Sequence, residues 1–231
     1  MLILGIDTSS KMSSITLYDS EKGVIAKNSV QVKMTHSDTL MILIDNLFKD
    51  SGKSIKDVNR VAVGIGPGSF TGIRIGVGTA KGLAYSRNID IVGVNTLDIL
   101  AENIEETDRE IITIIDAKKE RVFYSVYGYE NGKIWRKEEY RDRNINEIIE
   151  EFRRKNVIFT GDGVLAYGNL IIESGENFVL DSAENCLVNS VNLCKIAQEA
   201  KPISVHLLEP EYIAKSQAER AKQNCHEVLI K

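Results

Sequence analysis

Three short segments carry residue types that phosphate chemistry uses. Asp7-Thr8-Ser9-Ser10 follows an apolar run and is a candidate phosphate or metal loop. Gly66–Ser69 precedes a predicted helix, whose N-terminal N–H groups attract anions, and Gly161-Asp162-Gly163 would border a nucleotide. Plainer explanations stay open: a hairpin turn capped by Asp and Ser side chains, and tight strand-to-helix turns. The candidate cofactor-binding residues are Asp7, Gly66 and Gly68.

The histidines and serines give little indication of a metal site or a catalytic nucleophile. The histidines are His36, His206 and His226, and the i+4 neighbour of His36 is Leu40, so no two-histidine metal face forms there. Ser69 lies outside a G-x-S-x-G nucleophile motif, and no histidine and acid are placed near it in sequence to activate it. We therefore predict no catalytic residue and no metal ligand.

The glycine-rich segment after Val61–Ile65 must position these loops. The apolar run predicts a buried strand, the loop Gly66–Ser69 turns the chain, and a helix begins near Thr71. Glycines then occupy positions 72, 76, 78 and 82 of this helix, each costing about 1 kcal/mol relative to alanine. Something must approach that backbone closely.

Helical spacing divides this helix into stripes. One apolar stripe suits packing on the parent sheet and contains Ile73, Val77, Ala80 and Ala84. A second, smooth stripe contains Gly72, Gly76, Thr79 and Leu83, while Arg74 and Lys81 are placed on the solvent side. The smooth stripe has two explanations, close packing within the chain or a helix from another chain, and the spacing does not decide between them.

The remaining patterns predict two similar halves. Three strands (Leu2–Asp7, Ser13–Tyr18, Val24–Val32) precede a helix that contains Leu40, Leu43, Ile44, Leu47 and Phe48 at helical spacing. The strand at Val61, the glycine helix, a strand at Ile89–Val94 and a helix from Thr96 to Ile104 complete a β-β-β-α-β-α-β-α order. The same order recurs over about residues 110–201, with strands Ile111–Asp116, Arg121–Tyr129, Lys133–Tyr140, Val157–Thr160 and Asn177–Leu180 and helices Ile145–Arg154, Val164–Glu173 and Val191–Ala200. Two such units predict an α/β protein with a duplicated ribonuclease-H-like fold, the architecture of actin-like ATPases and sugar kinases. We place the boundary between residues 1–106 and 107–231.

Composition narrows the class of protein to which the chain can belong. The net charge of −4 disfavours a protein that grips nucleic acid alone through a broad basic surface. No run is long enough to span a membrane and no signal peptide is recognisable, so a cytoplasmic protein is expected. Its three cysteines lack C-x-x-C spacing and are expected to be reduced. Around Pro210-Glu211-Tyr212-Ile213 the chain is expected to dock on the body, before a polar tail from Lys215.

The ordered motifs resemble the bacterial TsaB (YeaZ-like) family. They are Leu4-Gly5-Ile6-Asp7-Thr8-Ser9, His36-Ser37, the segment from Gly64 to Gly76, Ala80-Lys81-Gly82-Leu83-Ala84, Asp116-Ala117-Lys118-Lys119 and Gly161-Asp162-Gly163. The resemblance covers about residues 1–170 and implies a subunit of the machinery that makes threonylcarbamoyladenosine next to the tRNA anticodon. It also implies the actin-like superfamily, a catalytic paralogue, TsaD, that transfers the threonylcarbamoyl group, and an ATPase, TsaE.

The chain departs from the catalytic paralogue at one point. There the matching segment resembles Gly-Val-Asn-His-x-x-x-His, whose two histidines bind metal. Here Thr96 and Leu100 stand at those positions, and leucine cannot ligate a metal. The resemblance therefore implies a non-catalytic subunit.

The expected partners are a TsaD-like protein, a TsaE-like ATPase, a second copy of the chain and, through the complex, tRNA. The predicted partner-binding residues are His36, Leu40, Leu43, Gly72, Gly76, Thr79 and Leu83. ATP or ADP is expected, if anywhere, at the interface with the partner. Two alternatives to a non-catalytic subunit stay open. The first is a nucleotide phosphohydrolase or kinase that uses Asp7 and the glycine loops, and the second is a metalloprotease.

Overall fold

The computed structural model describes the backbone of residues 1–31 and 36–213, and the side chains of 36–38 are outside the description. The first half contains β1 (Leu2–Asp7), β2 (Met12–Asp19), β3 (Gly23–Gln31), α1 (His36–Ser51), the 3₁₀ turn η1 (Ile55–Asp57), β4 (Arg60–Gly64), α2 (Phe70–Arg87), β5 (Asp90–Val94) and α3 (Thr96–Ala101). The second contains β6 (Glu110–Lys118), β7 (Arg121–Glu130), β8 (Lys133–Arg136), β9 (Arg141–Asn144), α4 (Ile145–Phe152), β10 (Val157–Thr160), α5 (Asp162–Ser174), β11 (Phe178–Leu180) and α6 (Ser190–Glu199).

The two sheets repeat one topology. The first has the order β3-β2-β1-β4-β5, and the second has the order β8-β7-β6-β10-β11, with β9 also paired to β7. In each, the first three strands form an antiparallel meander and the last two add parallel to the leading strand. The predicted duplication of a ribonuclease-H-like unit is confirmed.

One predicted strand is shorter in the structure, and a further short strand follows it. The run Lys133–Tyr140 forms only β8, and β9 follows after a break; both pair with the long strand β7. Near the break the backbone leaves the ladder, and Tyr140 turns to donate a hydrogen bond from its hydroxyl to Asp98 Oδ2 at 2.6 Å. Tyr140 is thus held by α3 at a point where the predicted strand has already ended.

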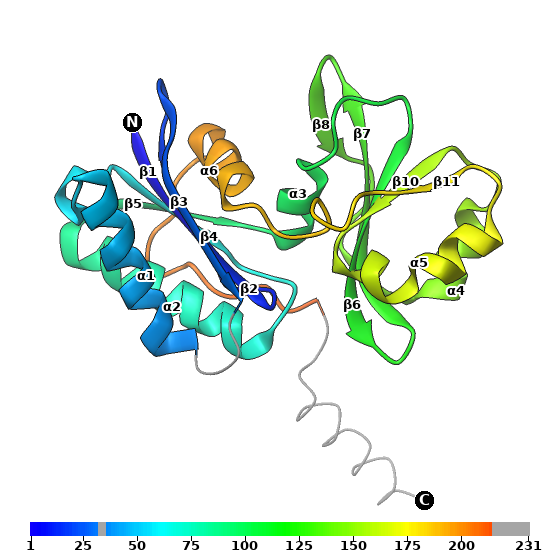
Figure 1. Ribbon diagram of the computed structural model, residues 1–231, viewed down its shortest axis with the longest axis horizontal. Coiled ribbons are helices and arrows are strands. Elements are labelled where there is room, and N and C mark those ends of the chain that lie inside the picture. The colour runs from blue at the N-terminus through cyan, green and yellow to red at the C-terminus, as the bar shows by residue number, and fades with distance from the viewer. Residues whose placement is uncertain (32–35, 214–231) are drawn as a thin grey trace, which may run out of the picture.

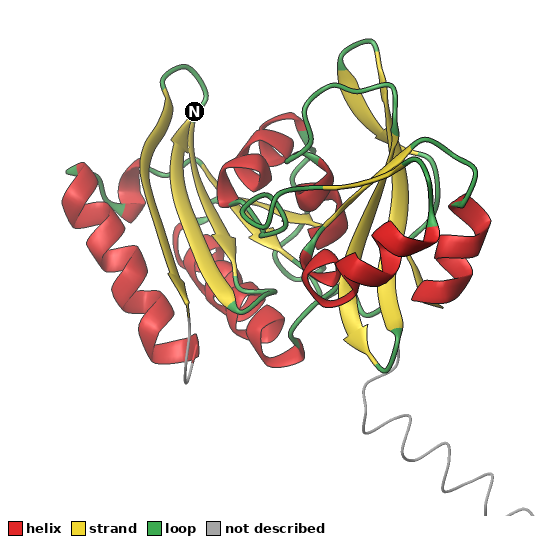
Figure 2. Ribbon diagram, turned by 45° about the vertical axis from the view of Figure 1, so that its right-hand side comes forward, coloured by secondary structure: helices red, strands yellow, loops and turns green. Residues whose placement is uncertain are grey.

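Helices cover both faces of each sheet (Figures 1 and 2). The outer face of the first sheet carries α1 over β2 and β3 and α2 over β4, whereas α4 and α5 lie on the outer side of the second sheet. Between the sheets lie α6, which packs on β1 and β2, and α3, which packs on β6 and β7. A division after residue 106 separates the sheets, and α3 and α6 each pack across it.

This exchange of helices joins the halves through apolar contacts. A single cluster combines Ile3 and Val92 of the first sheet, Leu97 of α3, Ile111 of the second sheet and Leu193 of α6. Burial of such side chains is the main favourable term in folding, so the two halves share one core. In the described part of the chain, no helix is long and apolar enough to cross a bilayer.

The last described residues return to the first half. Ile203 pairs with Ile91 at the edge of β5, Leu208 is buried in the core beneath α2, and the Glu211 N–H donates to Ile65 O at 2.8 Å. We call residues 202–213 the C-terminal strap. The predicted docking of residues 210–213 is confirmed.

Candidate functional site

The candidate loops meet at one edge of the first sheet. Strands β1, β4 and β5 are parallel neighbours, so Asp7, Gly64 and Val94 end side by side. From β4 the chain enters α2 through the loop Gly66–Ser69, where the Gly66–Pro67 peptide bond is cis. This loop lies on the turn after β1, because the Ser69 N–H donates to Ser9 O at 2.6 Å.

Asp7 is completely buried beneath this loop. Its Oδ1 accepts hydrogen bonds from the Ser9 N–H (3.1 Å) and the Ser9 hydroxyl (2.9 Å), whereas Oδ2 has no hydrogen-bond partner among the described residues. A Cβ on Gly64 would overlap Oδ2, so this glycine makes room for the carboxyl. Burial raises the pKa of Asp7 to about 6, and the two bonds from Ser9 oppose that rise.

The raised pKa of Asp7 predicts a pH dependence of stability. The unfolded carboxyl titrates near pH 3.9, at about the value of a free aspartate, so between about pH 4 and 6 the folded chain binds more protons than the unfolded one. From this group alone, the free energy of unfolding should fall by up to about 3 kcal/mol as pH rises through that range, then stay level. Urea unfolding across the range should show this slope in the natural chain and not in Asp7→Asn; equal slopes would contradict it.

The two loop glycines are also packed on the chain itself. Gly66 has φ of 108° and lies against the Glu211 carbonyl of the strap, and Gly68 has φ of 152° and lies against the Ser9 carbonyl. With Asp7 sealed beneath them, these residues do not fit a nucleotide phosphate. The arrangement matches the plainer explanation, a turn closed by Asp and Ser side chains.

The inward face of α2 explains two of its glycines. The Thr8 hydroxyl donates to Gly72 O at 2.7 Å, and a Cβ on Gly72 or Gly76 would overlap Thr8. Both glycines are buried, so they give no surface to another chain. Their assignment as partner-binding residues is wrong, because the turn after β1 fills the space that the smooth stripe leaves. The apolar stripe, in contrast, is buried as predicted: Ile73, Val77, Ala80 and Ala84.

The outward face of α2 contains the other two glycines. A Cβ on Gly78 or Gly82 would meet nothing within 4 Å among the described residues. Tyr85 continues this face and is 68% exposed. Thr79 and Leu83 are half-buried, and Leu83 packs against the core. Gly78 and Gly82 recur at i,i+4 and therefore share this outward face, whereas the predicted smooth stripe lies on another side of the helix.

Helix α1 lies beside α2 (Figure 1). Two of its residues were predicted to bind a partner and are buried instead. Leu40 and Leu43 are buried in the core of the first half, because helical spacing of apolar residues marks the face that packs on the sheet. Met41 and Ile42 are instead 50% and 60% exposed. The side chain of His36 is outside the described residues. We call the outward residues Met41, Ile42, Gly78, Gly82 and Tyr85 the α1–α2 surface.

The segments singled out for metal or nucleotide have structural roles. Thr96 is buried at the start of α3, and Leu100 is buried in the core between the sheets. Asp162 begins α5, and its Oδ1 accepts a hydrogen bond from the Asp116 N–H at 3.0 Å, which connects the start of α5 to β6. The side chains of residues 1–31 and 39–213 contain no group of three or more metal ligands.

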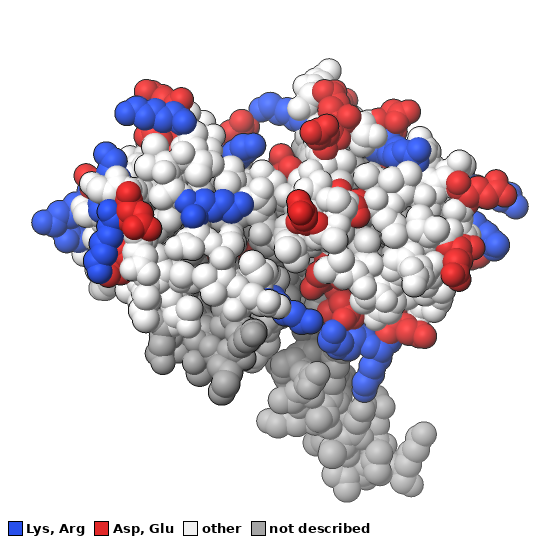
Figure 3. Space-filling model, in the orientation of Figure 1, with Lys and Arg blue, Asp and Glu red and all other residues white. Residues whose placement is uncertain are grey.

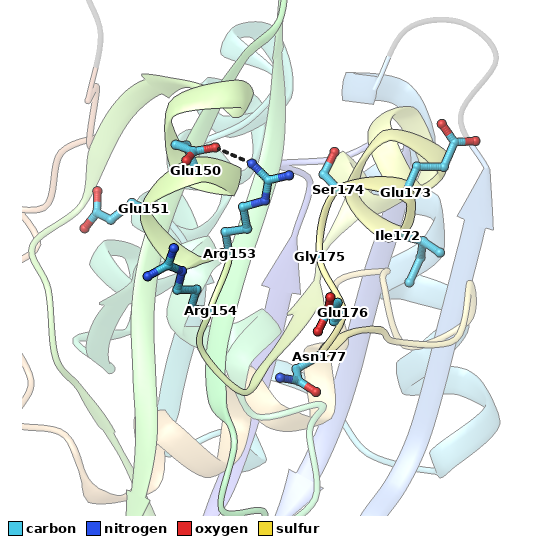
Figure 4. A pocket seen from close by; sticks show the side chains of 10 residues that line it. All are labelled: Glu150, Glu151, Arg153, Arg154, Ile172, Glu173, Ser174, Gly175, Glu176 and Asn177. Atoms are coloured by element: carbon cyan, nitrogen blue, oxygen red, sulfur yellow. Dashed lines mark hydrogen bonds and ion pairs between the residues drawn. The ribbon is translucent and has the colours of Figure 1, made fainter.

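Other surface features do not converge on chemistry. A hollow of about 1040 Å³ lies between the C-terminal ends of α4 and α5, lined by acidic and basic side chains such as Glu150 and Arg153, which pair at 3.3 Å (Figure 4). On the face in Figure 3, basic and acidic side chains are interspersed over both halves. This agrees with the expectation that the chain lacks a broad basic surface there.

Comparison with known proteins identifies the family. The family model described as TsaD, tRNA N6-adenosine threonylcarbamoyltransferase, matches residues 9–222. The chain is 32% identical over 224 residues to the tRNA threonylcarbamoyladenosine biosynthesis protein TsaB of Bacillus subtilis (strain 168), covering 95% of this chain and 96% of that protein. It is 30% identical over 220 residues to the protein of the same name from Escherichia coli (strain K12), covering 92% and 94%.

A solved structure gives the same fold. The crystal structure of an uncharacterized protein with similarity to peptidase YEAZ from Pseudomonas aeruginosa matches with a TM-score of 0.77 at 21% identity, over 92% of this chain and 99% of that chain. The two halves of our chain therefore have the arrangement seen in a YeaZ-type protein. The chain belongs to the TsaB (YeaZ) family, as its motifs predicted.

Proposed function

We propose that this chain is a non-catalytic subunit in the biosynthesis of tRNA threonylcarbamoyladenosine, and that it acts by binding a TsaD-like catalytic subunit. The observation that carries the proposal is its likeness, over more than nine-tenths of its length, to two proteins named for this pathway. The match to the threonylcarbamoyltransferase model supports a paralogous partner of related fold.

The residues between the sheets support the non-catalytic role. Metal-dependent group transfer needs ligands with lone pairs directed at an open position. At the positions where the motif comparison expects two histidines, the chain has a buried threonine and a buried leucine, Thr96 and Leu100. Leu100 packs in the apolar cluster that joins the halves, so this region supplies core packing.

The α1–α2 surface supports the binding role. Two glycines on the outward face of an exposed helix together cost about 2 kcal/mol of helix propensity, and within the described chain nothing approaches them. Exposed Met41 and Ile42 lie on the neighbouring helix, and methionine is enriched in protein interfaces. A partner helix seated on Gly78 and Gly82 would explain both features. The TsaE-like ATPase, the homodimer, indirect contact with tRNA, and ATP or ADP at the partner interface remain predictions.

Reconstitution tests the function. Purified chain, the TsaD-like and TsaE-like proteins of the same organism, tRNA, ATP and the threonylcarbamoyl-adenylate precursors are mixed, and modified adenosine is measured by mass spectrometry. Omitting this chain should lower modification by at least about tenfold, and the chain alone should give none. Modification that proceeds equally well without it, or that it performs without the TsaD-like protein, would overturn the proposal.

A further inference from the structure

Arg74 occupies a constrained position at one end of the α1–α2 surface. Its guanidinium Cζ lies 3.8 Å from the centre of the Phe70 ring, one helical turn earlier, and 5.9 Å from the centre of the Tyr212 ring on the strap. Its Nε donates a hydrogen bond to the Tyr212 hydroxyl at 2.9 Å. The two rings lie 5.1 Å apart, so they and the hydroxyl hold the guanidinium in one orientation.

The two Nη groups of the Arg74 guanidinium have no hydrogen-bond partner among the described side chains. Arginine has five N–H donors, and only the one on Nε is engaged by a residue of the described chain. No hydrogen bond or ion pair from the side chains of residues 1–31 and 39–213 reaches either Nη of Arg74, although its side chain is exposed. The long side chain has therefore already lost much of its rotamer freedom, while its two-pronged donor face is still available to a planar oxyanion.

Position on the helix connects Arg74 to the glycines. Arg74, Gly78 and Gly82 follow one another at i, i+4 and i+8 and so share one side of α2. Tyr85 lies at i+11 on the same side, about 16 Å along the helix axis from Arg74. A helix seated on the glycine backbone would pass directly beside the guanidinium.

Charge identifies the chemistry of the occupant. Helix α2 contains Arg74, Lys81 and Arg87 and no acidic residue. Lys81 is engaged, because its Nζ donates to Leu208 O of the strap at 2.8 Å. One vacant guanidinium beside an apolar, glycine-lined face suits a protein carboxylate, whereas a nucleic-acid site requires several basic side chains to neutralise successive phosphates.

We infer that Arg74 is the charged anchor of the α1–α2 surface and pairs with an aspartate or glutamate on a helix of the TsaD-like partner. Phe70 and Tyr212 act as positioning residues that hold the guanidinium toward that carboxylate. The strap thereby contributes to the interface through Tyr212 without contacting the glycines. This inference rests on the proposed function, since it names the chemistry of the same partner.

Calorimetric titration of the full chain into the TsaD-like protein of the same organism, at low and high NaCl, tests the inference. Arg74→Gln should weaken binding by about tenfold at low salt and reduce the dependence of affinity on salt. Arg74→Lys should recover only part of the affinity, because an ammonium keeps the charge but lacks the planar fork. Tyr212→Ala should weaken binding more than Tyr212→Phe, which keeps the ring. Thermal unfolding of each variant should match the natural chain.

Arg87→Gln is the matched control. Arg87 is an exposed arginine of the same helix, 13 residues from Arg74 and so about 220° further round the axis, and its replacement should change affinity by less than about twofold. If Arg74→Gln keeps the natural affinity and salt dependence while Gly82→Leu still loses binding, the inference fails and the proposed function stands. If the natural chain does not bind the TsaD-like protein, both fail. Loss of tRNA binding alone in Arg74→Gln would also overturn the inference.

Discussion

Replacing Gly76 by leucine is expected to destabilise the isolated chain by about 2–6 kcal/mol. The new side chain would overlap the hydroxyl of Thr8, which donates the buried hydrogen bond to Gly72 O. Thr8 is held between β1 and α2 and has no exposed surface, so it cannot turn away into solvent. Overpacking and an unmade buried hydrogen bond each cost about 1–3 kcal/mol, a large part of the stability of a typical domain. Urea unfolding measures the effect.

Gly78→Leu is the matched control for that substitution. It places the same side chain two residues further along the same helix, where a Cβ meets nothing within 4 Å among the described residues. Because leucine has the higher helix propensity, Gly78→Leu should raise the free energy of unfolding by about 0.5–1 kcal/mol. Its urea midpoint should therefore be equal to or higher than that of the natural chain. Equal stability of Gly76→Leu and Gly78→Leu would contradict the packing of α2 on Thr8.

Local pattern was sufficient for most of the fold. Alternation and helical spacing predicted the element order of both halves except for the short strand β9, and the repeated order predicted the duplicated sheets. The inward stripe of α2 followed from the same logic, since Ile73 and Val77 recur at the spacing of one helix face. These features depend on residues close in sequence, which is why they could be predicted.

The identity of the outward face of α2 depended on tertiary placement. Whether Gly72 or Gly78 faces outward is decided by the turn at Thr8, which is 64 residues from Gly72 in sequence. Leu40 and Leu43 were assigned to a partner although their spacing marked them as core. Met41 and Ile42, in contrast, are apolar residues that fall outside the buried stripe and are exposed.

The placement of the C-terminal strap could not be predicted from the sequence for a second reason. Leu208 is buried and Tyr212 stacks near Phe70, yet residues 202–213 form no helix or strand element and have no periodicity to read. Their placement follows from individual contacts, such as the Glu211 carboxylate accepting a hydrogen bond from Asn95 Nδ2 at 2.9 Å. The segment Pro210-Glu211-Tyr212-Ile213 was expected to dock on the body, but only the structure connects Tyr212 to Arg74.

Gly82→Leu and Gly78→Leu are expected to weaken binding to the TsaD-like subunit by at least about a hundredfold. Gly78 and Gly82 have no side chain to cover the α2 backbone. A partner helix in direct contact with that backbone would leave no room for a leucine side chain. The cost should appear mainly as faster dissociation, since docked contacts are lost while the approach is unchanged. Surface plasmon resonance with immobilised TsaD-like protein measures both rates, and tRNA modification in the reconstituted mixture should fall in parallel.

Asn169→Leu controls for the added apolar surface. Asn169 is exposed on α5, on the outer side of the second half, and leucine there adds the same side chain away from α1 and α2. Its binding to the TsaD-like protein should match that of the natural chain. Because Gly82→Leu and Gly78→Leu are expected to keep their folded stability, any lost binding in them is attributable to the surface itself. Natural affinity in both glycine variants would place the partner on another face, and the open glycines of α2 would then need a different explanation.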